Sequence, residues 1–361
     1  MAVTDQLTFR VYIGTYTQGE SKGIYVYRFD GSTGSWQLQS VTPDQQSPAF
    51  LAIHPNRRFL YAVNEVRDFA GRTSGAVSAY AIEDATGNLH RLNQQASMGP
   101  GPCHLSVDPT GRCVLVANYG GGSVALLPIN EDGSLKEATC FIQHEGRGSD
   151  PKRQTAPHAH SILCDPQGRF ALAADLGLDK IMIYELDLIG GKLMAHTPPW
   201  AALRPGAGPR HSVFHSNGRF LYVINELDST ITVFAYRAEE GELTSLQTVS
   251  TLPTGFSETN YCADIHIHPS GRYLYGSNRG HDSIVSYRVD PATGLLGATA
   301  HYSTHGRTPR GFAIDPSGAF LVAANQDSDN IVAFRIDEQT GALQLHGEPT
   351  RVPSPVCVKI P

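Results

Sequence analysis

The stretch that decides the fold is Gly208-Pro209-Arg210-His211-Ser212-Val213-Phe214-His215-Ser216-Asn217-Gly218-Arg219-Phe220-Leu221-Tyr222-Val223-Ile224-Asn225-Glu226. Its first half runs into turn-forming residues at 215–218, and its second half is a β-branched and aromatic run that ends at Asn225. This pattern predicts a β-hairpin. Because hairpin strands are antiparallel, Arg210 enters the first strand at the same end where Glu226 leaves the second. The sequence therefore predicts an arginine and a glutamate together at one edge of a sheet.

The turn of this hairpin recurs along the chain at intervals of about fifty residues. The second turn residue of the successive copies is Pro55, Pro109, Pro166, Ser216, Pro269 and Pro316. Each hairpin is followed by another β-rich run and a turn, as in residues 282–295, which supply a third and a fourth strand. Repeats of this length with several short strands are typical of a β-propeller.

The two ends of the chain complete one more unit. Residues 9–16 match the second strand of the repeat, residues 23–30 match the third, and residues 354–360 match the first. A blade built from both termini closes the ring and pairs strand edges that would otherwise be exposed. We therefore predict an all-β fold for residues 1–361 as a single domain: a seven-bladed β-propeller of four-stranded blades around a central channel.

Composition limits the partners and the compartment. The net charge is −6 and no basic run occurs, which argues against nucleic acid. No apolar stretch is long enough to span a bilayer, and the first residues do not resemble a secretion signal. The six cysteines are scattered without Cys-x-x-Cys spacing, which suits a reducing compartment. We expect a cytoplasmic protein, monomeric or weakly self-associating, that binds neither nucleic acid nor membrane.

Some positions repeat because folding needs them in every blade. His54, His215 and His268 occupy a turn position that is aspartate in other copies, so we interpret them as turn residues. An asparagine or aspartate closes the second strand of each copy and is expected to hydrogen-bond the following loop. A single active site does not require such repetition.

Two other positions keep their place in the repeat but vary in chemistry. Six residues before each turn residue stand Ala49, Cys103, His160, Arg210, Ala263 and Arg310. Ten residues after it stand Glu65, Tyr119, Leu176, Glu226, Arg279 and Gln326. Both columns are expected to ring one mouth of the channel. Any single pair there would also fit a structural salt bridge, but excess arginine beside a histidine and a glutamate indicates an anion site with an acid/base pair.

Three other features are less informative. His158 with His160, and His266 with His268, have a spacing that places two imidazoles on one strand face, but no third ligand follows, so we predict no metal site. Gly120-Gly121-Gly122 lacks the lysine of a phosphate loop. The polar loop 144–153 leads to the same mouth, and it is a candidate to cover it together with loops 66–75 and 254–261.

These motifs resemble the seven-bladed lactonase family, whose members include bacterial 6-phosphogluconolactonase and fungal carboxy-muconate cyclase. The resemblance covers essentially the whole chain and rests on residues 208–215 with Asn225-Glu226, residues 263–269 with Asn278-Arg279, and residues 309–312. It implies hydrolysis of 6-phosphoglucono-δ-lactone or a related sugar lactone, the second step of the oxidative pentose phosphate pathway, without a cofactor. The alternatives are a muconate-type lactonising cyclase and a non-enzymatic propeller that binds protein partners.

In the cyclase branch, the proposed site contains a His, an Arg, a Glu and an Arg in that order, which match His160, Arg210, Glu226 and Arg279 here. His158 competes with His160 for the role of the histidine. For lactone hydrolysis we expect His160 or Glu226 to take the proton of the attacking water, and Arg210 to stabilise the oxyanion. Arg279 and Arg310 are expected to bind a phosphate or carboxylate. Further substrate contacts are expected from His211, His158 and Gln326.

Overall fold

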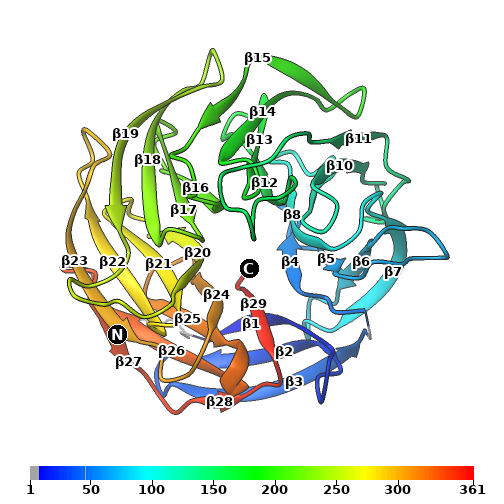
Figure 1. Ribbon diagram of the computed structural model, residues 1–361. Helices are drawn as coiled ribbons and strands as arrows, with labels where there is room; N and C mark the ends of the chain where they lie inside the picture. The colour runs from blue at the N-terminus through cyan, green and yellow to red at the C-terminus, as the bar shows by residue number, and fades with distance from the viewer. Residues whose placement is uncertain (1–7, 45) are drawn as a thin grey trace.

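The structure is a computed structural model that describes residues 8–44 and 46–361. Its strands form seven antiparallel sheets, the blades, arranged around a central axis (Figure 1). From the innermost strand outward, blade 1 contains β29 (Pro355–Lys359), β1 (Thr8–Thr15), β2 (Gly23–Asp30) and β3 (Ser35–Pro43); blade 2 contains β4 (Phe50–Ile53), β5 (Phe59–Asn64), β6 (Ala76–Ile82) and β7 (Leu89–Ala96). Blade 3 contains β8 (Pro102–Val107), β9 (Cys113–Asn118), β10 (Ser123–Pro128) and β11 (Cys140–Gln143); blade 4 contains β12 (Ala159–Cys164), β13 (Phe170–Asp175), β14 (Lys180–Asp187) and β15 (Lys192–Ala202).

The remaining blades follow the same order. Blade 5 contains β16 (Pro209–Phe214), β17 (Phe220–Asn225), β18 (Thr230–Arg237) and β19 (Glu242–Ser250); blade 6 contains β20 (Tyr261–Ile267), β21 (Tyr273–Arg279), β22 (Ser283–Val289) and β23 (Leu296–Ser303). Blade 7 contains β24 (Pro309–Ile314), β25 (Phe320–Asn325), the short 3-10 helix η1 (Gln326–Ser328), β26 (Asn330–Ile336), β27 (Leu343–Leu345) and β28 (Thr350–Arg351). The predicted all-β propeller with seven blades is confirmed. Among the described residues, no helix has the length and apolar character needed to cross a membrane.

The hydrophobic core lies between the blades. Every residue of β5, β9, β13, β17 and β25 is buried. These strands read as nearly continuous apolar runs because both of their faces pack against neighbouring sheets. The outer strands β3 and β19 are largely exposed or half-buried instead.

The repeated turn residues tie consecutive blades together. The imidazole Nε2 of each predicted turn histidine lies 2.9–3.1 Å from a glycine carbonyl in the turn of the next blade, in the pairs His54 with Gly111, His215 with Gly271, and His268 with Gly318. A buried tyrosine of blades 2, 5 and 6 donates its hydroxyl to an outer turn of the next blade, in the pairs Tyr61 with Gly133, Tyr222 with Gly294, and Tyr275 with Gly341. These residues thus have the structural role that their repetition predicts.

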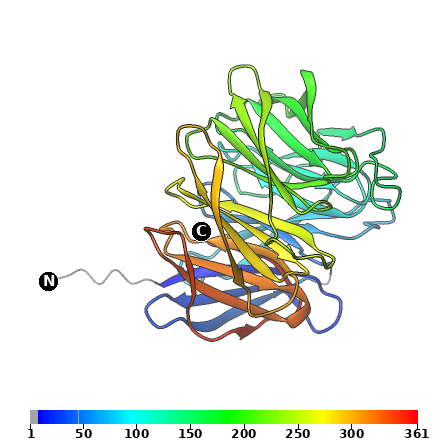
Figure 2. The same ribbon diagram turned by 60° about the vertical axis from the view of Figure 1, so that its left-hand side comes forward.

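The ring closes as predicted. β29 pairs antiparallel with β1, with Tyr12 opposite Lys359 and Ile13 opposite Val358. The blue N-terminal strands lie against the orange and red C-terminal strands in both views (Figures 1 and 2). Blade 1 is therefore assembled from both ends of the chain.

Blade 7 departs from the four-strand prediction. Its outer strand is interrupted, so that β27 and β28 both pair with β26. Gly347 in the interruption has a φ of +77°, and a Cβ there would lie 2.1 Å from the carbonyl oxygen of Gly34. His346 places its Nε2 2.9 Å from the carbonyl of Gly31. The strand breaks because the chain packs directly onto a turn of blade 1.

Candidate active site

A β-bulge lies at the entry of the innermost strand in blades 3 to 7. In four of them the register shift skips one residue, which is Cys103, His160, Arg210 or Arg310. In blade 6 it skips Ala263 and Asp264. Bulges re-aim a side chain and end regular pairing. The variable entry column of the sequence is therefore the bulge column, and its side chains are freed from the alternation of the strand.

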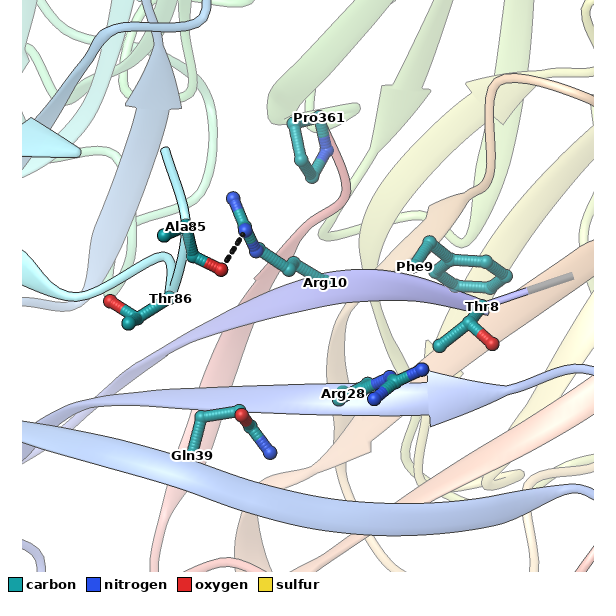
Figure 3. Close-up of a pocket in the computed structure, with 8 residues that line it drawn as sticks. All are labelled: Thr8, Phe9, Arg10, Arg28, Gln39, Ala85, Thr86 and Pro361. Carbon is teal, nitrogen blue, oxygen red and sulfur yellow. Dashed lines mark hydrogen bonds between the residues drawn. The ribbon is translucent and has the colours of Figure 1, made fainter. Parts of the chain in front are cut away.

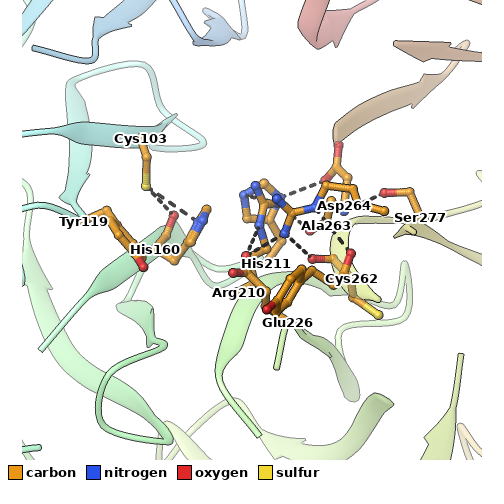
Figure 4. Close-up of polar contacts among 12 residues, drawn as sticks. Cys103, Tyr119, His160, Arg210, His211, Glu226, Cys262, Ala263, Asp264 and Ser277 are labelled. Carbon is orange, nitrogen blue, oxygen red and sulfur yellow. Dashed lines mark hydrogen bonds and ion pairs between the residues drawn. The ribbon is translucent and has the colours of Figure 1, made fainter. Parts of the chain in front are cut away.

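Three of these residues, Cys103, His160 and Arg310, line a cavity of about 220 Å³ at one mouth of the channel. It is lined by Glu65, Cys103, Tyr119, Arg153, His160, Glu226, Tyr261, Arg279 and Arg310. Figure 4 shows His160 and Glu226 with the neighbouring polar contacts. Arg210 does not line the cavity itself; it is 2% exposed and bonds directly to the lining residue Glu226. The structure thus brings together the histidine, the glutamate and the three arginines predicted from the sequence.

Glu226 is held by three guanidinium groups. Its Oε2 accepts bonds from Arg210 Nε at 3.1 Å and from Arg279 Nη2 at 2.8 Å, and its Oε1 accepts one from Arg153 Nη2 at 2.6 Å. Burial alone would raise the pKa of this carboxyl, but Arg279, Arg210 and Arg153 lower it to about 2. Glu226 is therefore an ionised anchor for three arginines and a weak base.

This depressed pKa predicts a stability loss in acid. The folded pKa of Glu226 is about 2 against 4.5 for the free side chain, so its contribution is complete above pH 4.5 and is lost as the pH falls toward 2. The contribution is on the order of 3 kcal/mol, because each pKa unit corresponds to about 1.4 kcal/mol. Denaturant unfolding of the unmodified protein and of Glu226→Gln at several pH values measures it. The stability difference between the two should shrink between pH 4.5 and 2, and a constant difference contradicts the prediction.

Arg210 has one guanidinium nitrogen left for a ligand. Besides Nε on Glu226, its Nη1 donates to the carbonyl of Ala263 at 2.6 Å and to His211 Nε2 at 3.3 Å. Its Nη2 has no acceptor among the described residues. Burial, together with Arg279 and Arg310, lowers the pKa of Arg210 to about 10, so the group remains a cation at neutral pH.

His160 is a buried, neutral side chain. Burial and the nearby Arg210 hold its pKa well below the usual value. Its Nδ1 lies 3.6 Å from Cys103 Sγ, and its ring packs edge-to-face against Tyr119. Burial raises the pKa of the Cys103 thiol. The two side chains therefore present neutral polar groups to the cavity.

Three of the expected substrate contacts lie elsewhere. His158 stacks on Tyr119 and places Nδ1 3.0 Å from the Tyr119 carbonyl, because it precedes the bulge that turns His160 inward. His211 follows the bulge of its strand and lies behind Arg210, with Nδ1 2.8 Å from Asp264. Gln326 begins η1, which starts directly after β25. None of the three lines the cavity within the part of the chain that the structure describes.

Two lining residues were not singled out from the sequence: Arg153, which comes from a loop, and Tyr261, the first residue of β20. Arg153 ends the polar loop 144–153 that was predicted to cover the mouth, and it lies over the ring of Tyr261, 5.3 Å from the centroid. The loop is anchored by buried Gln154, which donates to Asp179 at 2.7 Å. Loop 66–75 lines a different cavity through Phe69, Ala70 and Arg72. Only the length of the polar loop signalled the role of Arg153.

Two other cavities lack this cluster of arginines around a glutamate. One of about 450 Å³ lies between blade 1 and the β6–β7 turn (Figure 3), where Arg10 donates to the backbone carbonyls of Asp84 and Ala85. Another of about 400 Å³ lies in the channel, with His104, His211, Asp264, His266 and Lys359 among its lining residues. Asp264 there is held by His211 and His266. The candidate site is therefore the arginine-rich mouth.

Comparison with known proteins gives the same family as the motifs. A family model described as "Lactonase, 7-bladed beta-propeller" matches residues 10–360. The chain is 37% identical to the 6-phosphogluconolactonase of Bacillus subtilis, covering 96% of this chain and 97% of that protein. It is 36% identical to the 6-phosphogluconolactonase of Formosa agariphila, covering 84% of this chain and 86% of that protein.

A solved structure with the same fold is the periplasmic gluconolactonase PpgL of Pseudomonas aeruginosa. It superposes with a TM-score of 0.92 at 35% identity, covering 98% of this chain and 99% of that one. Architecture and sequence agree over nearly the full length. The chain belongs to the seven-bladed β-propeller lactonase family.

Proposed function

We propose that this protein hydrolyses 6-phosphoglucono-δ-lactone, or a closely related sugar lactone, to the open acid. The observation that carries the proposal is the mouth cavity of about 220 Å³, which three arginines and two glutamates line and in which Glu226 is also bonded by a fourth arginine, Arg210. Such a space suits one sugar-sized molecule with an anionic group. The names of the relatives from Bacillus subtilis and Formosa agariphila support the same substrate class.

We infer that Arg210 stabilises the charge that develops at the lactone carbonyl. Attack by water turns the carbonyl oxygen into an oxyanion, which a fixed cation in a partly dehydrated pocket stabilises. The Nη2 of Arg210 is uncommitted, while its other nitrogens are fixed by Glu226, Ala263 and His211. The guanidinium is thus oriented before the substrate arrives.

Arg310 is the candidate for the substrate phosphate. No hydrogen-bond acceptor for its guanidinium is found among the described residues, whereas Arg279 already donates to Glu226 and to the Cys262 carbonyl. The guanidinium carbon of Arg310 lies over the ring of Tyr16, 5.3 Å from the centroid, a cation–π contact that leaves its N–H donors free. A planar guanidinium with open donors matches a phosphate dianion.

Arg310→Ala is expected to weaken the phosphorylated substrate selectively. Loss of a charge-assisted bond should raise KM for 6-phosphoglucono-δ-lactone by roughly 10- to 100-fold, since such bonds contribute about 1.5–3 kcal/mol. Glucono-δ-lactone is the control, because any general damage to the site affects both substrates alike. Equal changes in kcat/KM for the two lactones contradict the phosphate role.

Neither base candidate from the sequence is well suited to accept the proton of the water. Glu226 already accepts hydrogen bonds from three guanidinium groups, and its pKa of about 2 makes it a poor proton acceptor. Burial next to Arg210 also keeps His160 a weak base. We assign Glu226 the role of holding the arginines and His160 that of a neutral hydrogen-bonding partner for the substrate.

A coupled assay with freshly generated 6-phosphoglucono-δ-lactone tests the function. The purified protein should accelerate opening well beyond the spontaneous rate in the same buffer, and glucono-δ-lactone and a carboxy-muconate are assayed in parallel. Acceleration on neither lactone overturns the proposal, and turnover of the muconate alone gives the cyclase instead.

We also propose a cytoplasmic location and a monomeric or weakly associating state. All six cysteines are free, and oxidising compartments favour disulfides. The Pseudomonas aeruginosa relative is named as periplasmic, so cell fractionation and light scattering are the deciding measurements.

A further inference from the structure

The mouth cavity contains a second carboxylate, Glu65, which the chemistry above does not use. Glu65 follows β5 and occupies the same repeat position as Glu226 after β17. In blade 5 the residue that enters the first strand of the same hairpin is Arg210, which binds Glu226. In blade 2 the equivalent residue is Ala49, which carries no charge. The repeat thus places a glutamate at the mouth without the arginine that would neutralise it.

We propose that Glu65 is the general base that activates the hydrolytic water. This inference rests on the proposed lactone hydrolysis. Tyr16 donates its hydroxyl to Glu65 Oε2 at 2.9 Å, which fixes the carboxylate. Its Oε1 has no partner among the described residues, and no cation of that part of the chain lies within ion-pair distance. One oxygen therefore remains to accept a proton.

The electrostatic environments of the two carboxylates differ in the direction that this role requires. Burial raises the pKa of Glu65, and the charges of Arg310 and Arg210 with the Tyr16 hydrogen bond offset this only in part. The three arginines on Glu226 have the opposite effect. When the environments of two carboxyl groups in one cavity shift their pKa values in opposite directions, the two groups commonly take different acid/base roles. Here the group with the raised pKa, Glu65, is the better proton acceptor.

The step balances with Glu65 alone as the proton carrier. The water oxygen bonds to the lactone carbonyl carbon while its proton moves to Glu65 Oε1, and the carbonyl electron pair becomes the oxyanion beside Arg210. The carbonyl then re-forms, the bond from that carbon to the ring oxygen breaks, and the ring oxygen takes the proton from Glu65. The product is the open hydroxy acid, which ionises in water, and Glu65 is returned to its carboxylate form.

Glu65→Gln keeps the shape and the acceptor for Tyr16 but removes the base. We expect kcat for the lactone to fall by roughly 100-fold, with KM changed by less than about threefold, because general bases contribute at least this factor. Exposed Glu240→Gln is the matched control and should behave as the unmodified protein. Thermal unfolding of each variant separates loss of the base from loss of the fold.

A second variant, Tyr16→Phe, tests the role without removing the carboxylate. The Tyr16 hydrogen bond lowers the pKa of Glu65, so its loss raises that pKa, and the acid limb of the kcat/KM profile should move to higher pH. The charged or titratable groups that act on Glu65 are, besides Tyr16, Arg310, Arg210 and Cys103, and His160, Glu226, Arg153 and Arg279 share its cavity; all of them are unchanged in this variant. A purely structural Glu65 would leave the limb in place.

The outcomes separate this inference from the proposed function. Turnover by the unmodified protein together with an unchanged kcat in Glu65→Gln, or an unmoved acid limb in Tyr16→Phe, overturns the role of Glu65 alone. No turnover of either lactone by the unmodified protein overturns both. Loss of kcat in Glu65→Gln with a shifted limb in Tyr16→Phe establishes the base.

Discussion

Glu226→Gln is expected to lower the free energy of unfolding by about 3–5 kcal/mol, the usual cost of removing one partner from a buried ion pair. The carboxylate is 5% exposed and neutralises Arg210, Arg279 and Arg153 at distances of 2.6–3.1 Å. A glutamine keeps the shape but leaves the guanidinium charges uncompensated. Its amide NH₂ group is a donor and cannot accept the hydrogen bonds that the arginines donate. Turnover should be lost as well, because Arg210 and Arg279 are then no longer held in place.

The matched control is Glu239→Gln. Glu239 pairs with Arg169 at 2.6 Å, but its side chain is 76% exposed, so its removal should cost no more than about 1 kcal/mol. Denaturant unfolding at neutral pH compares the two variants. Equal small losses would show that the buried arginine cluster does not depend on Glu226.

Arg210→Ala is expected to lower kcat by roughly 10²- to 10³-fold, the range found when one oxyanion donor is removed. The effect should fall mainly on kcat, because the oxyanion exists only in the transition state. Arg210→Lys keeps the charge but cannot satisfy Glu226, Ala263 and His211 together, so it should recover only part of the loss.

Arg219→Ala is the control for this substitution. Arg219 lies in the turn at the other end of the same hairpin, is exposed, and contacts the Ala292 carbonyl of the next blade. Its loss should leave kcat unchanged. A kcat within tenfold of the unmodified value in Arg210→Ala would contradict the assignment of Arg210 to the oxyanion.

The local pattern of the chain was sufficient to predict the ring and the pairing of its ends. Alternation, turn chemistry and a period near fifty residues are local properties, and the two strands of a hairpin such as 209–225 pair with each other across a short turn. The same period placed Arg210 and Glu226 at one end of a blade and aligned them with His160, Arg279 and Arg310. The interruption after β27 was not predictable, because it depends on the contact of Gly347 with blade 1.

The sequence by itself determined which residue types stand at the rim of each blade; only the tertiary structure decided which of them share a cavity and what charge each carries. Bulges place His160 in the mouth cavity and Arg210 against Glu226 but leave His158 and His211 outside the cavity, and none of this follows from strand alternation. Arg153 reaches Glu226 from a loop 73 residues away in the chain. Proton affinity depends on burial and on charges from other blades, so Glu65 and Glu226, equivalent in the repeat, acquire opposite pKa shifts only when the ring closes.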